Sequence, residues 1–377
     1  MKIAMLCSTH PVNDARVTHK QAVSLAKAGH EIVVFGQESK KSDDIPSVIL
    51  KPLGPADDRF KKRFAMMFKL YRAAASWRPD VVVCHEPESA LIGLLLKLRY
   101  GMKVVYDVHE CVQETVTRRM PKILRPVVCA GIVSLLKVIV RGADWVTVVS
   151  PPNYKFLGKM RGYDRIDILH NSPIIELFPL CSQDVDGPVT VIHEGFLGID
   201  RGLVQMLKAI AIASRSRDIR FSVLGQLRPQ DQKIFGDKIN QLGLGRIVTV
   251  TGWKPWREIG QIESQAQIGL ICLQNTPNNF MSLSNKLYNY MSCGHAIIGP
   301  EGSATADMIN KYECGLCVDT SQPEEIAEAI LKLCNNPELR KQMGANGRKA
   351  IEQELGWHKM EEVLAGIYEK LASELKT

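Results

Sequence analysis

The sequence predicts an α/β protein made of two doubly wound parallel-sheet domains, followed by one further helix. Its 377 residues exceed the roughly 250–300 residues at which a single hydrophobic core stops growing. Short continuous apolar runs alternate with segments of helical periodicity, which is typical of parallel strands joined by helices. This alternation occurs twice. We therefore expect domains at residues 1–175 and 186–356, and a last helix at 357–377 that could cross back to the first domain.

The first series runs from the N-terminus to about residue 150. Its predicted strands are "KIAMLC", "HEIVVFG", "PDVVVCHE", "KVVYDVHE" and "ADWVTVVS". Its predicted helices are "ARVTHKQAVSLAKAG", residues 63–76 and "SALIGLLLKLRYG". Gly29 and Gly101 end two of these helices, as glycine often does.

Hydrophobic periodicity then fades over residues 173–188, where proline, acidic residues and glycine indicate a linker. The second series of predicted strands is "VTVIHEG", "IRFSVLG", "IVTVTG", "IGLICLQ", "HAIIGP" and "CGLCVD". Its predicted helices are "RGLVQMLKAIAIASRS", "NKLYNYMSCG", "PEEIAEAILKLCNN" and "PELRKQMGANGRKAIEQELG".

Composition places the chain among globular proteins with a basic balance. The net charge is +8, which suits nucleic acid, acidic lipids or phosphorylated substrates. No apolar run reaches the ~20 residues of a spanning helix. Ten cysteines without a disulfide framework indicate reduced thiols and a cytoplasmic location. The C-x-x-C pair Cys314 and Cys317 is interpreted as small buried residues rather than a zinc site.

Basic and apolar residues occur together at helical spacing in residues 59–78 and 117–126. Two interpretations stay open for these segments. One is a helix on the inner face of a membrane, which would make the protein peripheral. The other is a solvated basic face over a packed apolar face.

The residues that follow the predicted strands are rich in His, Arg, Lys, Asn and Gly. Two parallel sheets that face one another would bring these strand ends to a common cleft, where open α/β sheets bind ligands. Backbone N–H groups, helix N-termini and fixed cations suit an anion there, and a diphosphate is the simplest candidate. Metalloprotease, hydrolase, P-loop and dinucleotide motifs are missing from the sequence. No nucleic-acid-binding module is recognised either.

Several segments, in order and spacing, resemble the retaining glycosyltransferase family 4, the group 1 glycosyltransferases. The matching segments are "NDARVTHKQAVSLAKAGHEIVV", "KVVYDVHE", "VTVVSPPNYKFL", "EGFLGIDRGLVQMLKAI", "SNKLYNYMSCGHAIIGPEG" and "CGLCVDTSQPEEIAEAI". The resemblance covers nearly the whole chain. It implies the GT-B architecture, two Rossmann-like domains facing a central cleft, with the acceptor on the first domain and a nucleotide-sugar on the second.

The resemblance also implies transfer of a sugar with retention of configuration and no required metal. Cations and N–H dipoles must then neutralise the leaving diphosphate. Arg201 stands where the family usually has Lys, and Lys286 is the second cation. Asn285 and Leu287 flank Lys286 at a predicted helix N-terminus, and Arg16 in the first loop is a further candidate for the diphosphate.

The sequence departs from the family pattern at three positions. The two signature glutamates fall at Met281 in the donor-sugar region and Asn289 at the ribose. The amide oxygen of Asn289 can still accept a hydrogen bond. A family Arg is replaced by Phe196, which removes one cation.

The remaining candidate positions follow from the same resemblance. His109 and Glu110 are the catalytic candidates near the transferred sugar. Gly252 and Trp253 are expected at the ribose or nucleobase, with a packed core ring as the alternative for Trp253. Glu301 and Gly302 are expected beside the donor sugar. The acceptor side is assigned to His10, Asn13, Asp14, His85 and Glu86.

Two functions from different classes remain open. The first is an active retaining glycosyltransferase that uses a glycan or lipid-linked acceptor in cell-surface polysaccharide synthesis. The second is a catalytically weakened relative that binds nucleotide-sugar or a partner without transfer. A nucleotide-sugar 2-epimerase of similar shape lacks motif support.

Overall fold

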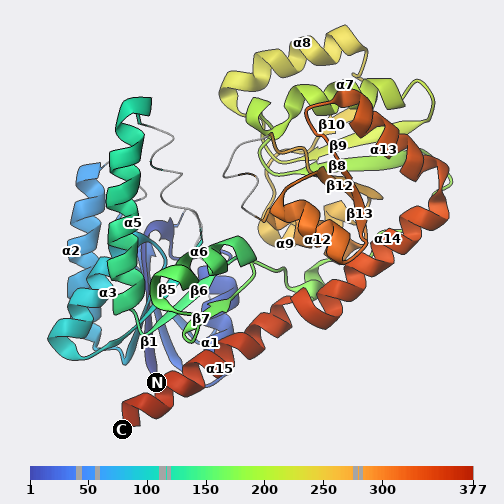
Figure 1. The fold of residues 1–377 in the computed structure, drawn as a ribbon. Coiled ribbons are helices and arrows are strands. Elements are labelled where there is room, and N and C mark those ends of the chain that lie inside the picture. The colour runs from blue at the N-terminus through green and yellow to red at the C-terminus, as the bar shows by residue number, and fades with distance from the viewer. Residues whose placement is uncertain are drawn as a thin grey trace. The chain divides into compact units, whose positions relative to one another are not determined.

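The chain folds into two compact units, each with its own parallel sheet (Figure 1). The structure is a computed structural model that describes residues 1–39, 45–55, 60–109, 116, 120–274, 279 and 283–376. The first unit contains Met1–His170 together with His358–Thr377, and the second contains Asn171–Trp357. Two doubly wound α/β domains were predicted, and this architecture is confirmed.

The sheet of the first unit has seven parallel strands in the order β3-β2-β1-β4-β5-β6-β7. The strands are β1 (Lys2–Pro11), β2 (Glu31–Gln37), β3 (Val48–Pro52), β4 (Val81–Cys84), β5 (Lys103–Val108), β6 (Trp145–Val148) and β7 (Ile166–Ile168). The order turns back at β1, because β2 lies on one side of β1 and β4 on the other. Right-handed crossovers therefore place the helices on both faces of the sheet.

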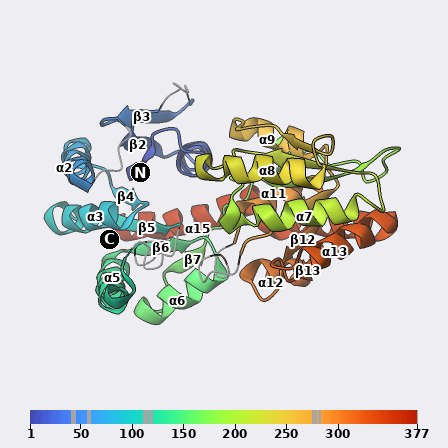
Figure 2. The ribbon, with the colours of Figure 1, turned by 90° about the horizontal axis from the view of Figure 1, so that it is seen from above.

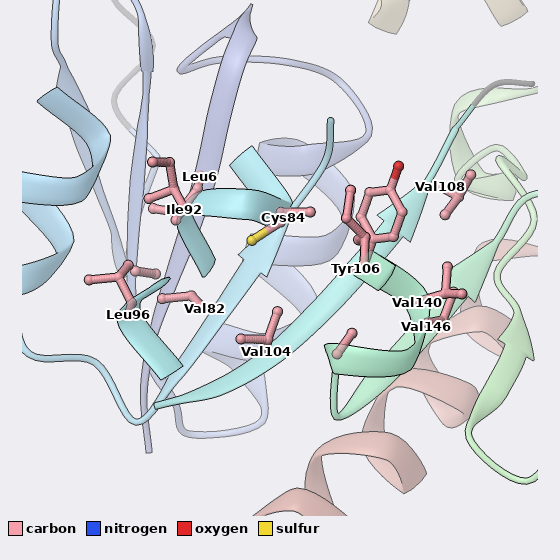
Figure 3. Close-up of a cluster of buried hydrophobic side chains, with 14 of the residues drawn as sticks. Leu6, Val82, Cys84, Ile92, Leu96, Val104, Tyr106, Val108, Val140 and Val146 are labelled. Atoms are coloured by element: carbon pink, nitrogen blue, oxygen red, sulfur yellow. The ribbon is translucent and has the colours of Figure 1, made fainter. Parts of the chain in front are cut away.

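One face is covered by α2 (Phe60–Trp77), α3 (Pro87–Tyr100), α5 (Arg125–Gly142) and α6 (Pro151–Arg161). A short helix η2 (Lys122–Leu124) leads into α5. Every second strand residue points to this face, among them Leu6, Val82 and Tyr106 (Figure 3). From the helices, Leu96 and Val140 enter the same core (Figure 3). This burial fixes the strands whose ends carry the polar side chains described below.

The last helix, α15 (Trp357–Lys376), packs on the first unit, as do the consecutive helices η1 (Val17–Ala22) and α1 (Val23–Lys27). Ser24 donates a hydrogen bond to Glu361 at 2.7 Å. Glu374 pairs with Lys103 at 2.8 Å and with Arg165 at 2.7 Å. The C-terminal helix thus returns from the second unit to the first.

The sheet of the second unit has six parallel strands in the order β10-β9-β8-β11-β12-β13. The strands are β8 (Val189–Glu194), β9 (Ile219–Leu224), β10 (Val248–Val250), β11 (Ile268–Leu270), β12 (Ala296–Pro300) and β13 (Gly315–Val318). The α-helices are α7 (Leu203–Ala213), α8 (Gln232–Leu242), α9 (Trp256–Glu263), α11 (Asn285–Cys293), α12 (Ala304–Lys311), α13 (Pro323–Asn335) and α14 (Pro337–Ala350). Short helical turns are η3 (Ile175–Leu177), η4 (Ile199–Arg201), η5 (Pro229–Asp231) and η6 (Ile351–Leu355). Figure 2 shows the units from above.

The segment assigned to a linker, residues 173–188, is part of the second unit. The backbone N–H of Cys181 donates to the carbonyl of Cys293 at 2.8 Å. The side chain of Gln183 donates to the carbonyl of Gly294 at 2.7 Å and accepts from Arg340 at 2.9 Å. The loss of hydrophobic periodicity therefore marks a segment held by hydrogen bonds. The structural division falls between His170 and Asn171 instead of at residues 175–186.

We expect Leu96→Ala to lower the free energy of unfolding of the first unit by about 2–5 kcal/mol, because Leu96 is fully buried between α3 and the sheet. Leu98 lies on the same helix and is 85% exposed, so Leu98→Ala is the matched control. Urea denaturation of both variants measures the difference. Equal midpoints for the two variants would contradict this packing.

Candidate active site

Asp107 on β5 organises the strand ends of the first unit. Its side chain is fully buried. The guanidinium of Arg16 donates to Oδ1 at 3.0 Å, and the hydroxyl of Thr147 donates to the same oxygen at 2.7 Å. Gln21 donates to Oδ2 at 2.6 Å. Burial would raise the pKa of Asp107, but the charge of Arg16 and the hydrogen bonds from His109 and His85 hold that pKa well below its ordinary value. Asp107 is thus a carboxylate at neutral pH.

His109 follows β5 and lies against the same carboxylate. Its Nε2 is 2.7 Å from Oδ2 of Asp107 and 3.3 Å from Nδ1 of His85. The ring of His10 is 5.5 Å away between centroids. Burial lowers the pKa of His109 and outweighs the attraction of Asp107, so the imidazole is neutral near pH 7. When Nε2 carries the proton and donates it to Asp107, Nδ1 is the acceptor nitrogen.

The carboxylates of Glu86 and Asp14, both assigned to the acceptor side, accept hydrogen bonds from backbone N–H groups. Glu86 accepts the N–H groups of Ser8 and Thr9 at 2.9 Å each and forms a capping box at the start of α3. Asp14 accepts the N–H groups of Arg16 and Val17 at 2.8 and 2.9 Å. These carboxylates position the loop after β1 and the helices beside it.

The other predicted residues of the first unit lie around the same strand ends. His85 is buried after β4, and its Nδ1 is 3.4 Å from Oδ2 of Asp107. His10 and Asn13 are partly exposed, and His10 Nδ1 is 3.1 Å from Asp14. Arg16 is buried in its ion pair with Asp107. Glu110 lies outside the described residues, as does Met281 in the second unit.

Three of these side chains have the spacing of a metal site. The ligand atoms of His85, Asp107 and His109 lie within 4.8 Å of one another. However, both oxygens of Asp107 already accept hydrogen bonds, and the guanidinium of Arg16 lies 3.0 Å from the carboxylate. A metal cation would compete with this permanent charge. The hydrogen-bond network therefore accounts for the cluster better than a metal ion does.

In the second unit, Lys286 lies in the first turn of α11, behind the cap residue Ser284. Leu287 is fully buried and anchors this turn, whereas Asn285 is exposed. Lys286 itself is buried, and burial lowers its pKa to about 8. The charge of Glu194 raises that pKa and the charge of Arg201 lowers it further. The two cations are therefore close enough to interact.

Glu194 ends β8 and faces α11. Oε2 of Glu194 accepts a hydrogen bond from the amide of Asn289 at 3.0 Å, and the Tyr290 hydroxyl accepts from the Glu194 backbone N–H at 2.8 Å. Burial and then the charge of Glu194 raise the pKa of Glu263 well above its ordinary value. Sequence reasoning missed Glu194 and Asp107, although each is an acidic residue at the end of a predicted strand.

Arg201 precedes α7 in a turn that requires glycine. Gly202 has φ of 80°, and a Cβ there would lie 2.3 Å from the carbonyl oxygen of Cys272. Arg201 Nε lies 4.0 Å from Asp200, and the side chain keeps 35% of its surface exposed. The guanidinium of Arg201 is thus near the surface, while the turn at Gly202 fixes its backbone.

The remaining donor-side candidates lie on exposed loops of the second unit. Trp253 is 63% exposed, so it is not a core residue, and Gly252 before it has φ of 78°. Glu301 and Gly302 follow β12 and are exposed. Phe196 is 58% exposed after β8, close in sequence to Glu194.

Comparisons with known proteins cover both units. The profile of Glycosyltransferase Family 4 matches residues 15–172, and that of Glycosyl transferases group 1 matches residues 182–350. The chain belongs to the group 1 glycosyltransferases. Alpha-D-kanosaminyltransferase of Streptomyces kanamyceticus is 24% identical over 189 residues, which are 49% of this chain and 46% of that protein. The chain thus matches under half of the length of this curated glycosyltransferase.

Solved structures resemble the present chain along nearly its whole length. Sucrose-phosphate synthase from Thermosynechococcus elongatus matches with a TM-score of 0.77 and 17% identity, covering 99% of this chain and 100% of that one. HepE of Anabaena in complex with UDP matches with a TM-score of 0.75 and 15% identity, at the same coverage. At such identities the likeness shows the fold, which is of the GT-B type with two Rossmann-like domains.

We expect Asp107→Asn to cost about 3–5 kcal/mol of stability at pH 7, because it leaves the buried Arg16 charge unpaired. A lowered pKa in the folded state stabilises the fold above the ordinary pKa of 3.8, and this contribution is lost as the pH falls below it. The difference in free energy of unfolding between wild type and Asp107→Asn should therefore become smaller at acid pH.

Denaturation between pH 7 and pH 3 measures this difference. The control is Asp164→Asn, which changes an exposed carboxylate of the same unit. A difference that stays constant with pH would show that Asp107 is not held as an anion by Arg16.

Proposed function

We propose that this protein is a retaining glycosyltransferase that moves a sugar from a nucleoside diphosphate sugar to a glycan or lipid-linked acceptor in cell-surface polysaccharide synthesis. The observation that carries the proposal is the buried ammonium group of Lys286 in the first turn of α11, whose pKa the charge of Arg201 lowers further. Family membership supports the reaction class, and the UDP complex of the structural neighbour HepE supports a nucleotide donor.

The donor diphosphate would bind Lys286, Arg201 and the N-terminus of α11. Breaking the bond between the anomeric carbon and the diphosphate oxygen leaves an electron pair on that oxygen, and these groups stabilise the developing charge. Burial holds the pKa of Lys286 near 8 in the free protein. A bound dianion would raise that pKa, so the ligand keeps the lysine charged. No metal is required in this scheme.

The ribose would bind Asn289 and Glu194 together. Asn289 uses its amide nitrogen to hold Glu194 at 3.0 Å, which leaves its amide oxygen for a ligand hydroxyl. The carboxylate of Glu194 offers a second acceptor beside it. This pair would compensate for the absence of a glutamate at position 289.

His109 would act from the first unit on the transferred sugar or the acceptor hydroxyl. The neutral ring is oriented by Asp107 at 2.7 Å, and this leaves Nδ1 to accept a hydrogen bond from a sugar hydroxyl. The new bond forms between the acceptor oxygen and the anomeric carbon, and the acceptor proton passes to the released diphosphate. Asp107, Arg16 and Glu86 are positioning residues in this scheme.

The location proposed for this reaction is the cytoplasm. The described cysteines are all free thiols, as in a reducing compartment. The acceptor would be presented at the inner face of the membrane.

We expect UDP-, GDP-, ADP- or dTDP-sugars to raise the melting temperature of the wild type with a preference for one nucleotide. Arg201→Ala and Lys286→Met should weaken this binding by at least about tenfold each, since each removes a charge-assisted contact to the diphosphate. Arg215, an exposed residue just after the other end of α7, is the matched control, and Arg215→Ala should bind like wild type.

Calorimetry between pH 6.5 and pH 9.5 adds a second readout. Affinity should fall as the pH rises through about 8, where Lys286 loses its charge, and the fall should be missing in Lys286→Met. No nucleotide binding, or equal loss in Arg215→Ala, would overturn the donor site.

We expect His109→Ala to bind the donor nucleotide like wild type and to lose at least about 100-fold in transfer rate, because His109 belongs to the first unit and the donor site to the second. Product formation from the preferred donor is the measurement. A wild type that binds donor but gives no transfer to any glycan or lipid-linked acceptor would favour the catalytically weakened alternative.

A further inference from the structure

The helix α5, with η2 before it, exposes apolar side chains along much of its length. Ile123 is 85% exposed, Val127 is 75% exposed, and Leu135 and Val138 are also exposed. Among the described residues of α5, the fully buried ones are Leu136, Ile139 and Val140, all in its last two turns. The N-terminal part of α5 extends past the strand ends of its unit (Figure 1).

The exposed apolar residues recur along one side of η2 and α5. Ile123, Val127, Leu135 and Val138 recur at spacings of three, four and eight residues, which places them on one side of a helix. The neighbouring helices add to this side of the unit, since α2, α3 and α5 lie next to one another in both views (Figures 1 and 2). Leu95 and Leu98 on α3 and Phe64 and Phe68 on α2 are exposed as well. We call these residues on η2, α2, α3 and α5 the apolar face.

The charges around the apolar face are of one sign. The sequences of α2 and α5 contain no Asp or Glu. Exposed basic residues accompany the apolar ones: Lys69, Arg72, Arg99, Arg125, Lys137 and Arg141. The single acidic residue of α3 after its cap, Glu88, already pairs with Arg63. A second copy of this chain would set two basic surfaces against each other, whereas an anionic lipid surface complements the charge.

The region Lys122–Gly142 is long and apolar enough, by composition, to cross a membrane. The way in which this region is joined to the sheet indicates that it lies on a membrane surface and does not cross the membrane. The helix joins β5 to β6, which are paired parallel strands of one sheet, and its last two turns are packed in the core of that unit. The stretch before the first buried residue of α5, residues 123–135, is about 20 Å long at 1.5 Å per residue, which is shorter than the ~30 Å hydrocarbon layer.

We propose that the apolar face of the first unit is a docking surface for an anionic membrane, with the side chains of Ile123 and Val127 inserted among the lipids and the surrounding Lys and Arg at the headgroups. This binding goes beyond the transfer reaction and needs no substrate. It also differs from a lipid-linked acceptor site, because the lipid is bound by surface charge and apolar insertion.

The test is sedimentation of the full-length chain with vesicles of phosphatidylcholine containing roughly one third phosphatidylglycerol, compared with vesicles of phosphatidylcholine alone. The double variant Ile123→Glu, Val127→Glu should bind the anionic vesicles at least about tenfold more weakly than wild type. Binding of the wild type should also fall in about 0.5 M salt, where the Debye length is short.

The matched control is the double variant Val250→Glu, Leu375→Glu, which adds the same charge at exposed apolar positions outside the apolar face. It should bind the vesicles nearly as well as wild type, and thermal melting of both variants confirms folding. The proposal would be overturned if the wild type did not bind anionic vesicles. It would also be overturned if the control lost as much binding as the Ile123→Glu, Val127→Glu variant. A dimer in ultracentrifugation that is lost only in that variant, without vesicle binding, would assign the face to a second copy instead.

Discussion

The buried ion pair between Asp107 and Arg16 is the interaction on which the strand ends of the first unit depend. Asp107 is the last residue but one of the parallel strand β5, and its carboxylate receives hydrogen bonds from the first loop, from η1 and from β6. A buried carboxylate is stable only when such donors surround it. The same charge orients His109 at 2.7 Å and keeps the ring next to His85. One electrostatic constraint therefore fixes both the local fold and the orientation of the catalytic candidate.

In the second unit the buried charge is a cation, the ammonium group of Lys286. Lys286 is held beside Glu194, whose charge supports that of the lysine, while Arg201 and burial oppose it. Glu263 nearby has its pKa raised, so it adds little negative charge. A bound anion would favour the charged form of Lys286. This effect is the physical basis for the diphosphate site proposed in this unit.

Prediction from the sequence was accurate where burial was continuous. Strands such as β4, with all four residues buried, leave an unbroken apolar run that is easily recognised. The edge strand β3 has mixed burial, and α8 has no fully buried residue, so neither produces a strong pattern and neither was predicted. The strand β1 runs on to Pro11, through residues assigned to a loop, because Pro11 lies in register with Gln37 on β2.

The sequence by itself determined the two-domain α/β architecture and the glycosyltransferase family. These follow from hydrophobic periodicity and from the order of motifs, which are properties of neighbouring residues. Only the tertiary structure decided that Asp107 binds Arg16, that Glu194 receives Asn289 and that α15 belongs to the first unit. Each of these joins residues far apart in the chain. A hydrogen bond between distant residues depends on strand order and helix packing, which leave no local pattern for the sequence to reveal.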